Sequence, residues 1–276
     1  MESQLDRKAA DLFEPAPGMA VPDEMYTRPV DLSVVVPVFN EEERIVNTVT
    51  LLAAYLGSQG KSYEVIISDD GSHDEGPSLV RERFASNDNV RLIGGKENRG
   101  KGAAVRRGVL AARGDVIIFT DADLSYPVET IGLCVNALAD YDVAVGSRNM
   151  PDSAIEITPT LLRRIAGPVF KAIVRGLVIN GFTDTQCGFK GFRSQAAHDI
   201  FTNCAANGFA FDVEVLALAR MFNYSITEVP VRLLVDSSDS RINLTSDPFR
   251  MIGELLQIRR RLRKAGEELQ QPSDTA

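Results

Sequence analysis

The amino-acid sequence predicts an α/β fold, a single domain built around a mostly parallel sheet. In the first half of the chain, short apolar runs rich in β-branched residues alternate with helical patterns, which is the order of successive βαβ units. Each run stops at turn-forming or acidic residues, as buried strands do where they open into loops. The length of 276 residues fits one large domain of this class or two small ones.

The individual elements follow in chain order. Continuous β-branched runs indicate buried strands, and apolar residues at helical spacing indicate helices. The expected strands of the first half are 32–38, 63–68, 90–93, 116–119 and 143–145, with helices at 41–57, 74–85, 100–112 and 128–138. The second half is less regular, with a helical stretch from residue 160, a loop at 181–190, helices at 194–201 and 212–222, a strand at 226–234 and a last helix from residue 248.

Composition limits the class of protein. With 44% hydrophobic and 25% charged residues, the chain is typical of globular proteins. We expect neither a transmembrane helix, which needs about 18–20 apolar residues, nor a signal peptide, because residues 1–28 are polar. A cytoplasmic location follows as an expectation. Three isolated cysteines and two histidines lack zinc-ligand spacing, so reduced thiols are expected.

Charge is distributed unevenly along the chain. The net charge is -8, yet residues 159–193 and 250–264 each contain six basic residues against one acid. An acidic body with two basic segments does not suit general nucleic-acid binding. It suits local capture of a phosphate or of an anionic membrane surface.

The most informative motif follows the strand expected at 116–119. Asp121 and Asp123 lie at the carboxyl end of that strand, where open α/β sheets bind ligands. Two close carboxylates repel each other unless a cation joins them, and hard divalent ions take oxygen ligands and often a substrate phosphate. The motif predicts a metal–diphosphate site, although most isolated Asp-x-Asp triplets are turn or capping residues.

Two other strand ends carry candidate binding residues. After the first strand, Pro37 ends the strand and Asn40 starts a helix, while Phe39 is available to stack on a base. After the second strand, the sequence Asp-Asp-Gly-Ser at 69–72 is a turn signature. Its position places a further acid beside the same crevice, where it can accept a hydrogen bond from a base N–H.

The sequence Asn-Arg-Gly-Lys-Gly at 98–102 precedes an alanine-rich helix. Its glycines let backbone N–H groups approach a ligand, and a helix N-terminus favours negative charge. It matches neither the phosphate loop of nucleotide triphosphatases nor the dinucleotide fingerprint. Lys101, Arg106 and Arg107 either contact a ligand or are simply solvated, and the sequence leaves both alternatives open.

Together the four motifs, in the order Pro-x-Phe-Asn-Glu, Asp-Asp-Gly-Ser, Asn-x-Gly-Lys-Gly and Asp-Ala-Asp, resemble glycosyltransferase family 2. The likeness is closest to its dolichyl-phosphate glucosyltransferase and dolichyl-phosphate mannose synthase branch, and it extends to an acceptor loop at 184–190 and a helix entry at 208–214. It implies a Rossmann-like, A-type nucleotide-diphospho-sugar transferase domain at 31–235. A flexible segment at 1–30 would precede this domain, and a mobile loop, a basic amphipathic helix and a polar tail at 236–276 would follow it.

The resemblance also implies site residues. Asp121 and Asp123 would hold Mg²⁺ or Mn²⁺, with Asp123 as the main protein ligand. Phe39 would line the base pocket and Asp69 would hold the base edge. The residues implied to contact the nucleotide-sugar are Pro37, Phe39, Glu41, Asp69, Lys101, Gly102, Asp121 and Ala122.

On the acceptor side, a polyprenyl or dolichyl phosphate is already anionic and needs positioning more than deprotonation. Arginine and lysine side chains can clamp such a phosphate. If a catalytic base is needed, Asp184 is the first candidate, with Asp212 and Glu214 behind it, and Asp212 is an equally good candidate for a helix N-cap. The candidate phosphate ligands are Arg148, Arg163, Lys190, Arg193 and Arg241.

Two amphipathic helices suggest contact with an anionic membrane. In the helix from residue 160, basic residues 164, 171 and 175 lie opposite an apolar face, and in the last helix apolar residues 252, 255, 256 and 262 accompany a basic cluster. The alternative is that both apolar stripes face the protein core and that the charges are merely solvated.

The sequence therefore predicts a metal-dependent, inverting glycosyltransferase, peripheral at the cytoplasmic face of a membrane. It would transfer a sugar from a nucleotide-sugar to a polyprenyl phosphate, and residues 184–190 favour a UDP-sugar over GDP-mannose. Within enzymes, transfer to a soluble phosphorylated acid or to a polysaccharide is the alternative. A non-catalytic nucleotide-sugar-binding scaffold is an alternative of another class, against which the intact Asp121 and Asp123 argue.

Overall fold

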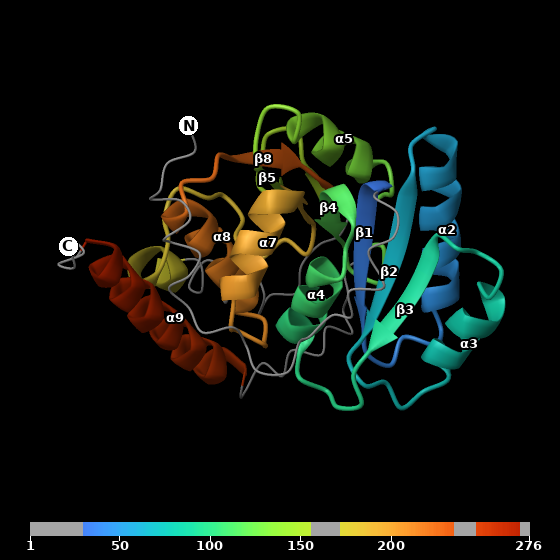
Figure 1. The fold of residues 1–276 in the computed structure, drawn as a ribbon. Coiled ribbons are helices and arrows are strands. Elements are labelled where there is room, and N and C mark those ends of the chain that lie inside the picture. The colour runs from blue at the N-terminus through green and yellow to red at the C-terminus, as the bar shows by residue number, and fades with distance from the viewer. Residues whose placement is uncertain (1–29, 156–171, 235–246, 271–276) are drawn as a thin grey trace, which may run out of the picture.

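The computed structural model describes residues 30–155, 172–234 and 247–270. A seven-stranded sheet forms the middle layer, in the order β3-β2-β1-β4-β7-β5-β8 (Figure 1). Neighbouring strands run parallel except for β7, which is antiparallel to β4 and β5. The predicted α/β fold with a mostly parallel sheet is confirmed. The strands are β1 Val30–Val38, β2 Tyr63–Asp69, β3 Val90–Gly94, β4 Gly114–Phe119, β5 Val143–Ser147, β7 Lys190–Arg193 and β8 Ile226–Pro230.

Helices cover both faces of this sheet. Helices α2, α3 and α5 pack on one face, and α4, α7 and α8 pack on the other, with α9 lying against α8 (Figure 1). A short second sheet pairs β6 Ala154–Ile155 with β9 Arg232–Leu233. The helices are α2 Ile45–Ser58, α3 Gly76–Arg83, α4 Lys101–Leu110, α5 Thr130–Ala137, α7 Ser194–Asn203, α8 Phe211–Met221 and α9 Asp247–Gln270.

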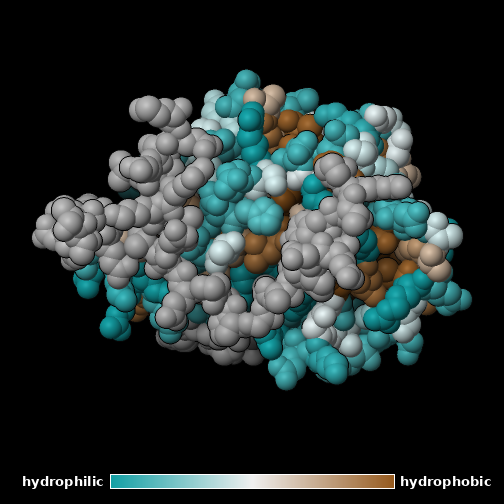
Figure 2. All heavy atoms as spheres, viewed as in Figure 1, coloured by the Kyte–Doolittle hydropathy of each residue, from teal (hydrophilic) through white to brown (hydrophobic). Residues whose placement is uncertain are grey.

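The strands are continuously apolar because both faces of the sheet are covered. Successive side chains of a strand point to opposite faces, so in β1 Val34 and Val36 join the core beneath α2, whereas Val35 joins the core beneath α4. The outer surface is different. The face shown in Figure 2 is mostly hydrophilic, with hydrophobic residues in smaller areas. Within the described ranges, no helix has the length and hydropathy that crossing a membrane requires.

The strand order reverses between β1 and β4. Strands β2 and β3 extend the sheet on one side of β1, and β4 starts its other side. At such a switch point the loops after the two strands diverge and leave a crevice at the carboxyl edge, where α/β proteins bind ligands. The loops after β1 and β4 carry the Pro-x-Phe-Asn-Glu and Asp-Ala-Asp motifs, so the topology brings them together.

Two elements differ from the sequence-based expectation. No strand was expected at β7, since the predicted loop ended at residue 190 and the next predicted helix began at residue 194. The strand expected at 226–234 is divided, with β8 joining the main sheet and β9 joining β6. The division follows Pro230, which has no N–H to donate to a continuing ladder.

Candidate functional site

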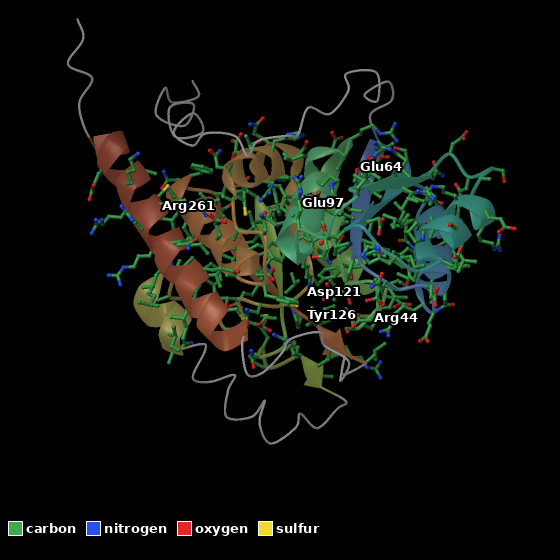
Figure 3. All side chains as sticks on the ribbon, turned by 90° about the horizontal axis from the view of Figure 1, so that it is seen from below. Arg44, Glu64, Glu97, Asp121, Tyr126 and Arg261 are labelled. Atoms are coloured by element: carbon green, nitrogen blue, oxygen red, sulfur yellow. The ribbon has the colours of Figure 1, made fainter. Side chains whose placement is uncertain are left out.

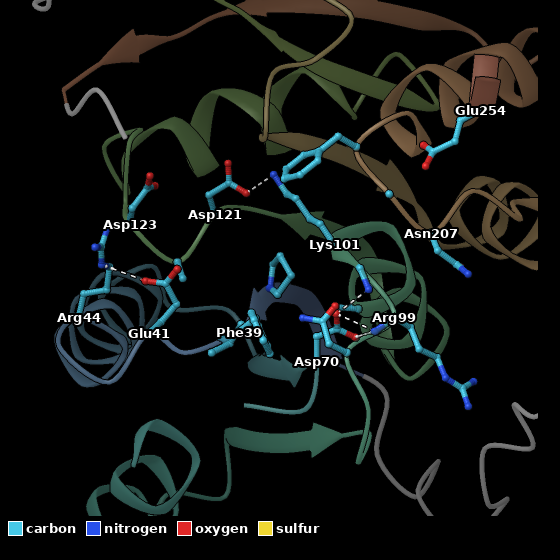
Figure 4. Close-up of a pocket in the computed structure, with 18 residues that line it drawn as sticks. Phe39, Glu41, Arg44, Asp70, Arg99, Lys101, Asp121, Asp123, Asn207 and Glu254 are labelled. Atoms are coloured by element: carbon cyan, nitrogen blue, oxygen red, sulfur yellow. Dashed lines mark hydrogen bonds and ion pairs between the residues drawn. The ribbon is translucent and has the colours of Figure 1, made fainter. Parts of the chain in front are cut away.

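A cavity of about 720 Å³ lies at the carboxyl ends of β1 and β4 (Figure 4). Its wall combines the loops after β1, β2 and β4 with the start of α4, the 207–209 loop and α9. The cavity thus occupies the place where the strand order predicts a ligand site. Of the residues implied to contact the nucleotide-sugar, six line it: Pro37, Phe39, Glu41, Lys101, Asp121 and Ala122.

The two aspartates after β4 both lie on the cavity wall. Asp121 accepts an ion pair from Lys101, with 2.5 Å between its Oδ1 and the Nζ atom (Figure 4). Asp123 accepts a hydrogen bond of 2.9 Å at Oδ1 from the backbone N–H of Ser125, which fixes its carboxylate in a turn. Gly188 passes directly behind Asp121, since a Cβ atom there would lie 2.0 Å from Oδ2. Only glycine therefore allows this close approach.

Lys101 stands at the start of α4 among several carboxylates. Burial alone would lower the pKa of its ammonium group, but the charges of Asp121 and Asp212 outweigh burial and raise the pKa. The side chain is 21% exposed, so it still reaches the cavity. Lys101 is thus a cation paired with acids at the cavity rather than a solvated surface lysine.

The loops after β1 and β2 are fixed to each other. Asn40 has a φ of 53°, a left-handed conformation that asparagine tolerates better than most residues. Its backbone N–H donates to Ser72 Oγ at 2.8 Å, and its Oδ1 accepts the N–H of His73 at 2.8 Å. The ring of Phe39 meets the His73 ring edge-on, with centroids 6.2 Å apart. Phe39 is thereby presented at the cavity on a rigid turn.

Of the acid pair after β2, Asp70 lines the cavity. Its carboxylate accepts the backbone N–H of Gly100 at 2.7 Å and that of Arg99 at 3.1 Å, and so holds the loop that leads into α4 (Figure 4). Burial raises the pKa of Asp70 in spite of these bonds. Asp69, predicted to hold the base edge, does not line this cavity, and its Oδ1 accepts hydrogen bonds from the N–H and hydroxyl groups of Ser72. Its contact with a base stays a prediction.

The structure corrects the role expected for Gly102. Its N–H donates to the carbonyl oxygen of Asn207 at 2.7 Å, and a Cβ atom there would lie 2.6 Å from the carbonyl oxygen of Ala206. This glycine admits the 206–208 loop and does not offer its N–H to a nucleoside. Arg106 also holds that loop, donating to Asn207 Oδ1 at 2.8 Å, and Arg107 donates to the Asp69 carbonyl oxygen at 2.7 Å. Neither arginine is simply solvated.

Asp184, the first candidate for a base, forms a bidentate pair with Arg148. The distances are 2.6 Å from Nε to Oδ2 and 2.9 Å from Nη2 to Oδ1. Burial alone would raise the pKa of Asp184, but the hydrogen bonds and charge of Arg148 outweigh it and lower the pKa. A carboxylate held in its ionised form by an arginine is a weak proton acceptor. Arg148 itself is about one-third exposed.

Lys190 and Asp212 form a buried ion pair beneath the sheet. The Lys190 Nζ atom also donates to the Cys187 carbonyl oxygen at 2.7 Å and lies 5.5 Å from the centre of the Phe119 ring. Lys190 was predicted to bind the acceptor phosphate, and this is wrong, because its ammonium group is fully buried by its own partners. Asp212 lies inside α8 and makes no side-chain cap, so its alternative as an N-cap is wrong as well.

Glu214 is likewise engaged in holding structure together. One oxygen of its carboxylate accepts the N–H groups of Ala205 at 3.0 Å and Ala206 at 2.6 Å. The other pairs with Arg261, which lies on α9 (Figure 3). Glu214 therefore ties α9 to the 205–206 turn and is not placed to act as a base at the cavity.

The remaining predicted phosphate ligands lie elsewhere. Arg193 pairs in register with Val116, near the start of β4, and donates to the carbonyl oxygens of Leu138 and Tyr141 at the end of α5. Its prediction is wrong because the antiparallel course of β7 carries it to the opposite edge of the sheet from Asp121. Arg163 and Arg241 lie outside the described residues.

The two helices expected to meet a membrane are described in part. In α9, Met251, Leu255, Ile258 and Ala265 are buried against the core, and Leu256 is 49% exposed. Of the predicted apolar stripe, Leu255 thus faces the protein, whereas Leu256 faces outward. Of the helix expected from residue 160, residues 172–177 are described as helical, and basic residues 164 and 171 fall outside the described residues.

Some cavity residues were not foreseen. Asp70 could have been found from its place in the same motif as Asp69, whereas Asn207 and Glu254 carry no local signal. Glu254 reaches the cavity from α9, across from Asp121 (Figure 4), and only the packing of α9 on α8 brings it there.

The residues present fit a hard divalent cation that shares its coordination with a substrate. In the described part of the chain, no three acidic, histidine or cysteine side chains are grouped so that they could hold a metal unaided. Asp121 and Asp123 offer oxygen ligands at the cavity, and Mg²⁺ is commonly bound by one or two carboxylates together with substrate phosphates and water.

Comparison with known proteins agrees with this architecture. The family model described as glycosyl transferase family 2 matches residues 33–201. The chain belongs to glycosyltransferase family 2. A dolichyl-phosphate beta-glucosyltransferase from Dictyostelium discoideum is 34% identical over 247 residues, covering 84% of this chain and 75% of that protein. One from Saccharomyces cerevisiae is 33% identical, covering 83% and 74%.

Solved structures share the fold of this glycosyltransferase. Glucosyl-3-phosphoglycerate synthase from Mycobacterium tuberculosis, crystallised with Mn²⁺, UDP and glucosyl-3-phosphoglycerate, superposes with a TM-score of 0.58 at 17% identity, covering 89% of this chain and 86% of that one. Mannosyl-3-phosphoglycerate synthase from Rubrobacter xylanophilus gives 0.61 at 16% identity, covering 90% and 78%.

Proposed function

We propose that this family 2 glycosyltransferase transfers a hexose, with inversion, from a UDP-sugar to a polyprenyl phosphate of the dolichyl phosphate class at a membrane surface. The observation that carries the proposal is the cavity in which Phe39, Lys101, Asp121 and Asp123 meet. Support for the acceptor comes from the dolichyl-phosphate beta-glucosyltransferases that match over most of both chains. Support for UDP comes from the fold neighbour crystallised with it.

Each cavity residue has a role that its chemistry permits. Phe39 stacks on the uracil ring, held by the turn that Asn40 and Ser72 fix. Lys101 binds the diphosphate, to which an ammonium group on a flexible stem is suited. Asp123 and Asp121 would hold Mg²⁺ or Mn²⁺. When bound, such an ion offsets the negative charge on a leaving nucleoside diphosphate.

The acceptor needs positioning and shielding more than it needs a base, because its phosphate is already ionised. Arg148 is the one predicted phosphate ligand that the described residues place in a partly exposed position on the carboxyl side of the sheet, just after β5. Asp184 orients its guanidinium group through the bidentate pair. Arg163 and Arg241 remain predicted ligands.

The test offers UDP-glucose, other UDP-hexoses and GDP-mannose, each with Mn²⁺ or Mg²⁺, to the protein with a polyprenyl phosphate in mixed micelles, and identifies the product by mass spectrometry. We expect a glycosyl polyprenyl phosphate from a UDP-hexose. Asp123→Ala should reduce turnover by about 10³-fold, since metal stabilisation of a leaving group is worth several kcal/mol. Asp115→Ala is the matched control, because Asp115 is exposed at the other end of the same strand.

The outcomes separate the alternatives. Transfer to 3-phosphoglycerate but not to the lipid would replace the proposed acceptor with a soluble phosphorylated acid. UDP binding without transfer to any acceptor would favour a scaffold. A product that forms equally well with excess chelator present would contradict the metal requirement.

A further inference from the structure

The ion pair between Lys101 and Asp121 raises a question about the order of binding, because Asp121 is also one of the two carboxylates proposed to hold the metal. The Lys101 ammonium lies 2.5 Å from Asp121 Oδ1. A divalent cation on the same oxygen would sit about 2.0–2.1 Å away, and two cations cannot share that position without strong repulsion. Lys101 therefore occupies the position that a metal ion bound to Asp121 Oδ1 would take.

The charges around Lys101 favour such a placeholder. Its ammonium group interacts with Asp121, Asp212 and Asp123, and Lys190 neutralises part of this negative charge from below. Three carboxylates against two ammonium groups leave the cluster with one net negative charge. Without Lys101, the cluster would have two, and the acids would be under greater mutual repulsion.

The backbone of Lys101 is held on both sides, while its side chain has room to move. Gly100 donates its N–H to Asp70 at 2.7 Å, and Gly102 donates its N–H to Asn207 at 2.7 Å. The lysine side chain has a flexible four-carbon stem, and it borders a cavity of about 720 Å³. The ammonium group can therefore pivot into the cavity without any movement of α4.

We propose that Lys101 is an internal counter-cation that occupies Asp121 in the absence of metal and moves to the diphosphate of the donor when a metal ion takes its place. The proposal rests on the proposed function, because the donor supplies the anion to which Lys101 moves. Metal and nucleotide binding then become coupled. Metal alone must displace Lys101 at a cost, whereas metal together with UDP gives the displaced ammonium a new partner.

The test titrates Mn²⁺ into the protein with and without UDP, following free Mn²⁺ by electron paramagnetic resonance. In the wild type, UDP should tighten Mn²⁺ binding by about 10- to 100-fold, within the usual range of coupling. Lys101→Met should tighten the binding of Mn²⁺ alone by about tenfold while weakening UDP binding, so that the coupling shrinks. Lys101→Arg keeps the charge and should keep most of the coupling. Lys61→Met, an exposed lysine away from the cavity, is the control.

If Lys101 occupies the metal position, Lys101→Met must change the two affinities in opposite directions, with tighter Mn²⁺ binding and weaker UDP binding. A lysine that only orients Asp121 would, on removal, weaken both ligands together, and that result would overturn the proposal. In an Asp121→Asn background, Lys101→Met should no longer tighten Mn²⁺ binding, which ties the effect to this pair. Circular dichroism and thermal unfolding confirm that each variant is folded.

Different binding results would contradict the role of Lys101 and the proposed function. If the wild type binds Mn²⁺ and UDP together but Lys101→Met leaves Mn²⁺ affinity unchanged, the placeholder is wrong and the function stands. If the wild type binds no UDP in the presence of Mn²⁺, the proposed function and the transfer of Lys101 to a diphosphate both fail.

Discussion

The acids predicted to hold the metal and the acids predicted to act as a base differ in how they are paired. In the first half, Asp121 and Asp123 lie at a cavity. Asp121 forms an ion pair with Lys101, and this pair is partly open to solvent. In the second half, every acid predicted as a base is at least 95% shielded and bound to a basic partner. These pairs are Arg148 with Asp184, Lys190 with Asp212, and Arg261 with Glu214.

This difference shows that acids at the cavity and acids in buried pairs serve different purposes. Removing one partner of a buried pair leaves an uncompensated charge and destabilises the protein, whereas an acid at a cavity can exchange partners with a ligand. We expect substitutions of the cavity residues in the first half to reduce ligand binding and activity with little loss of stability. Substitutions in the three buried pairs of the second half should reduce stability first.

The largest effect is expected at Lys190. Lys190→Met removes the partner of the buried Asp212 and should lower the free energy of unfolding by about 3–5 kcal/mol, measured by urea denaturation. Replacing both partners, as in Lys190→Met with Asp212→Leu, should recover much of this loss, because a buried pair can be exchanged for apolar side chains.

Stability unchanged in Lys190→Met, combined with a selective loss of acceptor binding, would break the comparison. Lys190 would then be a phosphate ligand, as the sequence predicted. Arg193→Met is a useful companion variant, since Arg193 ends the same strand but is exposed, and its guanidinium group donates to the backbone oxygens of Leu138, Ala139 and Tyr141.

On the other side of the comparison, Phe39→Ala should weaken UDP binding and leave folding nearly unchanged. Stacking of a base on an aromatic side chain is worth about 1–3 kcal/mol, which corresponds to roughly 5- to 150-fold in affinity. Isothermal titration with UDP in the presence of Mn²⁺ measures this effect. Phe39→Tyr keeps the ring and should keep the affinity. Equal losses in both variants would show that the turn, not the ring, contributes the binding.

Much of the first half could be predicted from the sequence. A parallel strand buried on both faces must be apolar along its length, and it ends where polar residues begin, so β1, β2 and β4 are visible in the pattern. Because the carboxyl ends of parallel strands share one edge of the sheet, placing Phe39 and Asp121 near each other required only the strand order.

The second half could not be predicted in the same way. Strand β7 has the sequence Lys-Gly-Phe-Arg, and its antiparallel direction depends on the pairing with β4 and β5. That direction decides that Lys190 is buried and that Arg193 points to the opposite edge. The choice of Arg261 as the partner of Glu214, 47 positions away, depends on how α9 packs on α8. No local pattern carries that information.

Arg261→Met tests whether α9 is tied to the core by this pair. Loss of a hydrogen bond to a charged, buried acceptor should lower the free energy of unfolding by about 1.5–3 kcal/mol. Arg260→Met is the matched control, since Arg260 is the exposed neighbouring residue on the same helix. Hydrogen exchange should also show faster opening of the 205–206 turn in Arg261→Met only. Similar effects in both variants would mean that net charge, rather than the pair, stabilises α9.

The smallest effect concerns the pH dependence that Asp184 contributes. Its pKa in the folded protein lies below the usual value of 3.8, because Arg148 outweighs the effect of burial. A carboxyl group whose folded-state pKa is lowered stabilises the protein fully above its unfolded pKa, and that contribution is lost as the pH falls through the lowered value. The wild type should therefore lose stability more steeply than Asp184→Asn below about pH 4.

Urea denaturation at a series of pH values from neutral to acidic measures this difference. Asp140→Asn, an exposed acid at the end of the α5 region, should give a curve parallel to that of the wild type. If Asp184→Asn is also parallel throughout, Arg148 does not hold Asp184 in its ionised form, and Asp184 becomes available again as a proton acceptor. The difference between the two halves would then not extend to the residue that was the first candidate for a base.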